Sequence, residues 1–281
     1  MQPRKPRLPF ANAWFFPAAA LHAALLLPIS VLGLLDLIPA LPGLATPAGH
    51  AREMLFGFAL AVIAGYLLGP QPLRLTLALL ACWLLARLGS LFWPGSWLAS
   101  GATLLFAAGL VWKVLPRFIG AAKKWRNQSI APVVGGFALL SAVTAFGLDH
   151  GLVRLLQHEA LLLLAALLFF MGGRIIAPAL AGHAQNEGRQ LNARVQPQLE
   201  GAVLVLLALA LLLAPLPWLL LQRLSGAILI TASALTGMRL LRWQPWHCRT
   251  RMDLLALVIG YAWLALGLLL IRHGAHAPHH L

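Results

Sequence analysis

The side chains best suited to chemistry are gathered in one short stretch of the chain, which reads His50-Ala51-Arg52-Glu53-Met54-Leu55-Phe56-Gly57-Phe58. His50 and Met54 are four residues apart, so on a helix they share one face. Imidazole and thioether are a known ligand pair for heme iron and for copper, which makes both residues candidate cofactor and metal ligands. Glu53 and Arg52 are candidate structural or pathway residues. A purely structural interpretation stays open, because the backbone dipole favours Glu53 near a helix N-terminus.

Two further residues are candidates because of the apolar sequence around them. His22 stands inside the first apolar run, where an unpartnered imidazole is costly. It is either a ligand that faces the helix bundle or a hydrogen-bonded packing residue. Arg174 follows Gly172 and Gly173, whose small size lets helices approach closely. The Arg174 side chain can extend to the lipid headgroups, and a place in an ion pathway is the alternative.

The composition excludes several classes of function. Hydrophobic residues make up 60% of the chain and charged residues only 10%, so lipid is the expected main solvent and partner. The net charge of +14 comes from basic residues in loops between apolar runs, which argues against nucleic-acid binding. No nucleophile–base set, phosphate loop or carboxylate pair is visible, and the sequence leaves open whether the protein is an enzyme.

The elements that must position these residues are transmembrane helices. A helix needs about twenty apolar residues to cross the hydrocarbon core, and long Leu/Ala runs without alternation exclude a barrel. The sequence predicts an all-α, polytopic bundle in one transmembrane domain, 1–281. About nine helices are expected, at about 14–35, 53–69, 73–93, 97–115, 131–148, 155–177, 199–220, 222–241 and 253–271.

The basic residues predict the orientation of the bundle. With nine crossings and a cytoplasmic N-terminus, most Lys and Arg residues fall on the cytoplasmic side, as the positive-inside bias requires. The His-rich tail at 273–281 then lies outside, where its imidazoles could hold copper loosely or form a flexible end. We expect a multi-pass protein of a bacterial inner membrane.

At the stretch that begins with His50, the chain resembles the NnrS family of bacterial membrane proteins. The likeness recurs, in the family's order, in Phe58–Tyr66, Arg126-Asn127, Gly172-Gly173-Arg174-Ile175-Ile176 and Gly260-Tyr261-Ala262-Trp263-Leu264-Ala265-Leu266-Gly267. The resemblance implies heme and copper bound in the membrane. It also implies a role in tolerating nitric oxide, a possible small ligand, often beside denitrification.

The chain also departs from the family's pattern. In the family's His-x-His-Glu-Met motif the second His position is occupied by Arg52, and a guanidinium has no lone pair for a metal. Val258 stands where the family has a His near the last helix, and Ala13-Trp14-Phe15-Phe16 replaces Arg-Pro-Phe-Phe. The chain stops where the family continues for about three helices. It therefore resembles a short, divergent member.

Two other functions remain open at this point. The protein could be a cofactor-free scaffold that packs against a partner membrane protein supplying the lost helices. It could also be a carrier of a small solute or metal ion, with a pathway lined by His22, His50 and Glu53.

Overall fold

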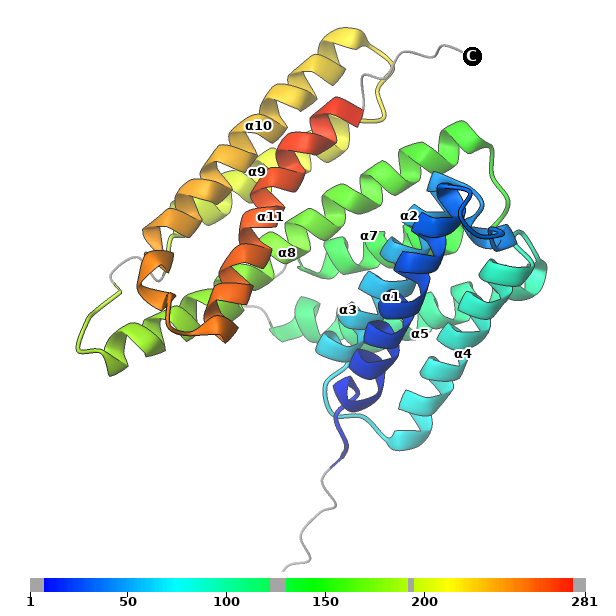
Figure 1. The fold of residues 1–281 in the computed structure, drawn as a ribbon, viewed down its shortest axis with the longest axis horizontal. Coiled ribbons are helices and arrows are strands. Elements are labelled where there is room, and N and C mark those ends of the chain that lie inside the picture. Colours follow the sequence, from blue (N-terminus) through cyan, green and yellow to red (C-terminus); the bar gives the residue numbers. More distant parts are fainter. Residues whose placement is uncertain (1–7, 122–129, 192–194, 275–281) are drawn as a thin grey trace, which may run out of the picture. The chain divides into compact units, whose positions relative to one another are not determined.

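The computed structural model describes residues 8–121, 130–191 and 195–274, and within these ranges the regular structure is helical (Figure 1). Besides the helices, these described ranges contain an isolated antiparallel β-bridge between Phe10 and Pro70. The predicted all-α class is confirmed. The chain divides into two compact units, Met1–Leu161 (unit 1) and Leu162–Leu281 (unit 2).

Six helices of the described part are long and apolar enough to cross a membrane. They are α1 (Asn12–Leu34), α4 (Leu73–Phe92), α5 (Trp97–Ala121), α8 (His150–Asn186), α10 (Leu219–Arg242) and α11 (Met252–Gly274). Two shorter apolar helices accompany them, α7 (Ile130–Val143) and α9 (Pro197–Leu213). A membrane protein follows from these helices, whereas nine crossings and a cytoplasmic N-terminus stay predictions. The tail beyond Gly274 lies outside the described residues.

The second expected crossing is built from three consecutive helical pieces. These are α2 (Pro47–Arg52), the π-helix η2 (Glu53–Ala59) and α3 (Leu60–Leu67). Thr46 begins α2, because its hydroxyl accepts a hydrogen bond from the Gly49 amide at 3.1 Å and Pro47 occupies the first turn. The helix thus starts before the expected position near Glu53. His50 and Arg52 therefore lie on a helix and not in the loop before it.

In unit 1, α1 packs on η2 and α3, α4 packs on α5, and α5 packs on α7. Close approach of α1 depends on Gly65, because a Cβ there would lie 2.7 Å from the ring of Phe16. The buried rings of Phe15 and Phe106 stack with their centroids 5.9 Å apart. The short helix η1 (Pro42–Leu44) joins α1 to α2 and packs on α4.

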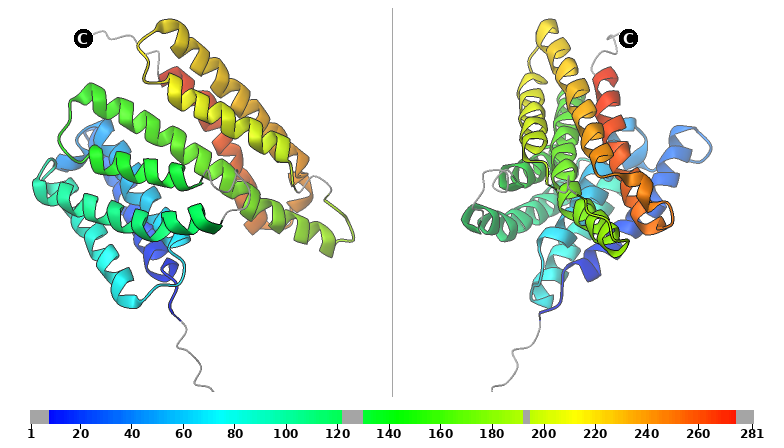
Figure 2. Two further views of the ribbon diagram at one scale, coloured as in Figure 1. Left: turned by 180° about the vertical axis from the view of Figure 1, so that it is seen from behind. Right: turned by 90° about the vertical axis from the view of Figure 1, so that its left-hand side faces the viewer.

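In unit 2, α10 packs against both of its neighbours in the chain, α9 and α11 (Figure 2). The Ser233 hydroxyl donates to the Ala265 carbonyl at 2.7 Å and joins α10 to α11. The short helix η3 (Pro245–Cys248) connects these two helices. Interhelical hydrogen bonds of this kind replace the hydrophobic driving force that lipid does not supply.

Candidate functional site

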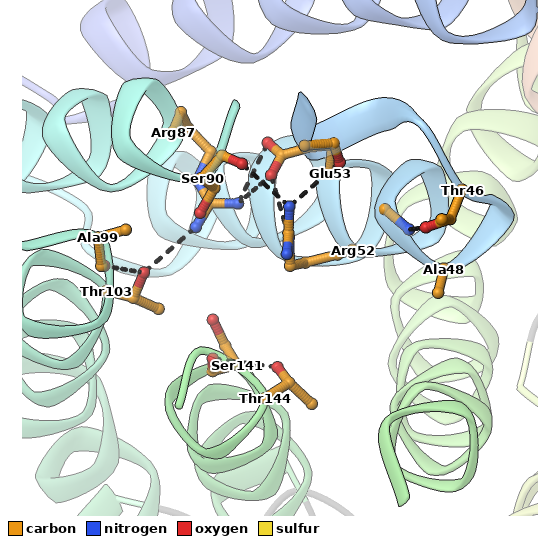
Figure 3. Close-up of polar contacts among 12 residues, drawn as sticks. Thr46, Ala48, Arg52, Glu53, Arg87, Ser90, Ala99, Thr103, Ser141 and Thr144 are labelled. Carbon is orange, nitrogen blue, oxygen red and sulfur yellow. Dashed lines mark hydrogen bonds and ion pairs between the residues drawn. The ribbon is translucent and has the colours of Figure 1, made fainter. Parts of the chain in front are cut away.

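The carboxylate of Glu53 is the centre of a buried polar cluster in unit 1. Glu53 begins η2 and has no exposed surface. Arg87 Nη1 lies 3.2 and 3.3 Å from its two oxygens, and Arg52 Nε lies 3.4 Å from Oε1. His22 Nε2 lies 3.5 Å from Oε2 (Figure 3 shows the two arginines). An ionisable group inside a membrane bundle marks a functional site by default, and here its partners are identified.

Arg87 reaches Glu53 from α4 and is itself only 4% exposed. Its Nη2 donates to Thr103 Oγ1 on α5 at 3.4 Å, and Thr103 donates in turn to the Ala99 carbonyl at 2.8 Å. From the sequence, an arginine inside this apolar run could extend to the headgroups or pair with a heme propionate. Its pairing with Glu53, 34 positions away, was not foreseen.

Arg52 joins three segments of unit 1. While its Nε faces Glu53, its Nη2 donates to the carbonyls of Gly43 in η1 and Ser90 in α4, at 3.2 and 3.1 Å. A planar guanidinium can make these bonds in different directions at once, which an imidazole cannot. Arg52 therefore connects these segments and, having no lone pair, cannot itself ligate a metal.

His22 and the π-helix are fitted closely to each other. The buried imidazole of His22 lies 3.3 Å from the Glu53 carbonyl through Nε2 and packs edge-on to Trp83, centroids 5.4 Å apart. Trp83 Nε1 donates to the Gly57 carbonyl at 3.0 Å. A Cβ at Gly57 would collide with the His22 ring, so only glycine fits there. One-turn π-helices are frequent at functional sites.

His50 is held by a serine from α1. Its Nδ1 lies 2.6 Å from Ser30 Oγ, and the Ser30 hydroxyl donates to the Leu27 carbonyl at 2.9 Å. Since the one hydroxyl hydrogen goes to Leu27, we assign Nδ1 of His50 as the donor to Ser30. In the neutral imidazole, this tautomer leaves Nε2 without a hydrogen and with its lone pair available.

The remaining predicted residues have ordinary packing contacts. Met54 is half-buried and packs against the cluster of Leu26, Leu44 and Leu91. The guanidinium of Arg174 lies over the ring of Phe170, 4.5 Å from its centroid. In the described part of the chain, no group of three or more His, Cys, Asp or Glu residues is arranged to hold a metal ion. Ligation would have to involve fewer such residues or other donors.

Unit 2 contains a second buried charge that the sequence did not single out. Arg239, 1% exposed, lies 2.6 Å from Glu200 Oε1, and its Nη1 donates to the Phe169 carbonyl at 2.9 Å and to the Tyr261 hydroxyl at 3.1 Å. A Cβ at Gly173 would collide with this guanidinium, and one at Gly172 with the ring of Tyr261. The two glycines thus make room for Arg239 and Tyr261, in keeping with the packing interpretation.

Comparison with known proteins gives one family. The model of the family described as NnrS protein matches residues 8–280, nearly the whole chain. No curated protein and no solved structure matches the chain.

Proposed function

The chain belongs to the NnrS family, and on that premise we propose that it is a NnrS-like protein of a bacterial inner membrane that binds heme through His50 and acts in the response to nitric oxide. Heme, when bound, supplies an iron that can coordinate a diatomic gas.

The observation that carries the proposal is the contact between His50 and Ser30. Histidines that ligate metals almost always give their other ring N–H to a fixed acceptor, which sets the tautomer and the ring orientation. Ser30 Oγ, at 2.6 Å from Nδ1, is such an acceptor, and it is fully buried. His50 is thereby oriented with a free Nε2, a ring nitrogen that could ligate heme iron.

The other candidate residues support His50 in different ways. Met54 is the proposed thioether partner of His50 for iron or for copper, since its sulfur is a soft donor. His22 has its Nε2 engaged by Glu53, at 3.3 Å from the carbonyl and 3.5 Å from the carboxylate. We therefore assign His22 to holding η2 in place, and His50 to ligation.

A visible spectrum of the purified protein tests the proposal. We would express the chain in a bacterial membrane with heme available, purify it in mild detergent and record the dithionite-reduced spectrum. The same spectrum would be taken for His50→Ala and for the control His247→Ala, whose side chain is exposed in η3. We expect a heme band in the wild type and in His247→Ala, and its loss in His50→Ala.

Each other result selects a different function. A band that survives in His50→Ala would contradict ligation by His50. No band and no bound copper in the wild type would favour the cofactor-free scaffold. Transport of a solute or metal ion into vesicles, lost in Glu53→Gln, would favour a carrier.

A further inference from the structure

A second candidate site lies in unit 1, at the end of the helices where three connections meet. It is a cleft of about 750 Å³, within the range of ligand sites. Its walls come from η1 and α2, from the turn Pro94-Gly95, and from the segment 144–157, which comprises the α7–α8 connection and the first turns of α8. Because all three connections are at helix ends, the cleft is placed at the boundary of the bundle. His50, Met54 and Glu53 do not line it.

The charged side chains that line the cleft are basic. They are Arg52, Arg154 and the ionisable His150, and no Asp or Glu is among the described residues of its walls. Arg154 is exposed and forms no ion pair with the described residues. Arg52 shares Glu53 with Arg87, so two guanidinium groups face one carboxylate. The cleft therefore carries uncompensated positive charge.

The contacts within the walls of the cleft leave hydrogen-bond donors available to a ligand. Arg52 uses Nε and Nη2 for its contacts, and its Nη1 donates to none of the described residues. Figure 3 shows Arg52 together with Thr46, Ala48 and Thr144, which also line the cleft. Gln157 Nε2 donates to the Ala48 carbonyl at 2.8 Å and fixes the wall that bears Arg154 to the wall that bears Arg52.

Asp149 is the acidic residue next to the cleft in sequence, and its carboxylate caps the start of α8. Asp149 Oδ2 accepts hydrogen bonds from the amides of Gly151 and Leu152, at 2.9 and 3.4 Å, and so begins α8. Much of the remaining wall is proline, glycine and alanine, which lets a ligand approach the backbone closely.

We propose that this cleft binds an oxyanion, a phosphate or carboxylate group, between Arg52 and Arg154. Guanidinium groups bind such planar or tetrahedral oxyanions through paired hydrogen bonds. At the boundary of a bundle the oxyanion comes either from solution or from the headgroup of an anionic lipid. The two sources share one chemistry and are separated by experiment.

The test compares Arg154→Gln with the matched control Arg223→Gln, an exposed arginine of α10 outside the cleft. In one arm, inorganic phosphate is titrated by calorimetry into protein in phosphatidylcholine nanodiscs at constant ionic strength. In the other, nanodiscs with and without phosphatidylglycerol are used, and lipid retained by the protein after purification is counted by native mass spectrometry. Arg154 is exposed and forms no ion pair or side-chain hydrogen bond with the described residues, so the variant should keep the wild-type unfolding temperature.

Saturable binding in the first arm identifies a soluble oxyanion, and retained phosphatidylglycerol in the second identifies a lipid headgroup. In either case we expect Arg154→Gln to bind about tenfold more weakly and Arg223→Gln to bind as the wild type does. Equal binding by the two variants, or no binding in both arms, would overturn the proposal. None of these readouts depends on heme.

Discussion

At the scale of single residues, the buried side chain of Glu53 depends on the guanidinium groups that contact it. Arg87 supplies the closest contact, with 3.2 and 3.3 Å to the two carboxylate oxygens. Arg87→Gln would leave a buried carboxylate with weaker partners, which typically costs about 3 kcal/mol or more. We expect a clearly lower midpoint of thermal unfolding in detergent for this variant than for the wild type.

A double variant separates this effect from a general loss of packing. In Glu53→Gln/Arg87→Gln no buried carboxylate is left unpaired, so part of the lost stability should return. Arg223→Gln removes an exposed charge and should stay within about 0.5 kcal/mol of the wild type. An Arg87→Gln protein as stable as Arg223→Gln would show that the pair contributes little.

The burial of Cys248 leads to a separate prediction, about the reactivity of its thiol. Its side chain is 2% exposed in η3, and burial raises the pKa of the thiol above its usual value. The thiolate is the nucleophile, so alkylation of Cys248 in a Cys82→Ser background should be slow at pH 8. The pH at which its rate rises should be higher than the pH at which the rate rises for a cysteine in an unfolded peptide. A rate at pH 8 equal to that of the peptide would contradict this. Mass spectrometry after timed maleimide treatment measures the rate.

The same raised pKa bears on stability. A neutral thiol is favoured in the fold, so its contribution is present below the thiol's ordinary pKa and decreases as the pH rises above it. Other groups also titrate in that range, so the labelling rate is the sharper measurement.

Several residues of the site could be predicted from sequence, but their partners could not. His50, Arg52 and Glu53 stand out because ionisable groups are rare in apolar runs. Ser30 and Arg87 contact them from 20 and 34 positions away, and no local period connects such positions. The role of Arg239 was not predicted, because an arginine near a helix end usually indicates the topology of a membrane protein. Here the side chain is buried against Glu200.

At the scale of elements, the π-helix η2 has a steric requirement that can be tested. A Cβ at Gly57 would collide with His22 and would lie 3.1 Å from Arg87 Cδ. Gly57→Ala should therefore destabilise the protein by about 1 to 3 kcal/mol, as overpacking does. The matched control is Gly101→Ala in α5, where a Cβ meets nothing within 4 Å. The unfolding midpoint should fall for Gly57→Ala alone, and a shared response would contradict the collision.

The second crossing also shows what limits prediction of elements. The capping signals Thr46 and Pro47 precede the apolar run, so a helix start at Pro47 could have been inferred from them. The π-helix could not, because hydrophobic periodicity assumes 3.6 residues per turn and does not register one inserted residue. Contacts from other helices accompany it, since Trp83 Nε1 donates to the Gly57 carbonyl and the His22 ring lies where a Cβ of Gly57 would be.

At the scale of the whole molecule, the count of crossings depends on the short helices. With 14 residues, α7 is about 21 Å long, which is less than the roughly 30 Å hydrocarbon core. Unit 1 nevertheless shows that α7 brings the chain back to the end of the helices at which α5 begins. The connection before α2, the turn Pro94-Gly95 and the segment after α7 line one cleft, so the chain leaves that end along α5 and comes back along α7.

The other end of unit 1 is marked by the start of α1. The Ala11 amide donates to the Gly69 carbonyl at 3.0 Å, which places the α3–α4 connection beside the chain's entry into α1. Combined with the positive-inside bias, this arrangement predicts Gly69 on the cytoplasmic side and Gly95 and Gly147 outside. Alkaline phosphatase fused after Gly95 or Gly147 should be active, and after Gly69 inactive. Opposite activities at Gly95 and Gly147 would mean that α7 does not cross, and eight of the nine expected crossings would then remain.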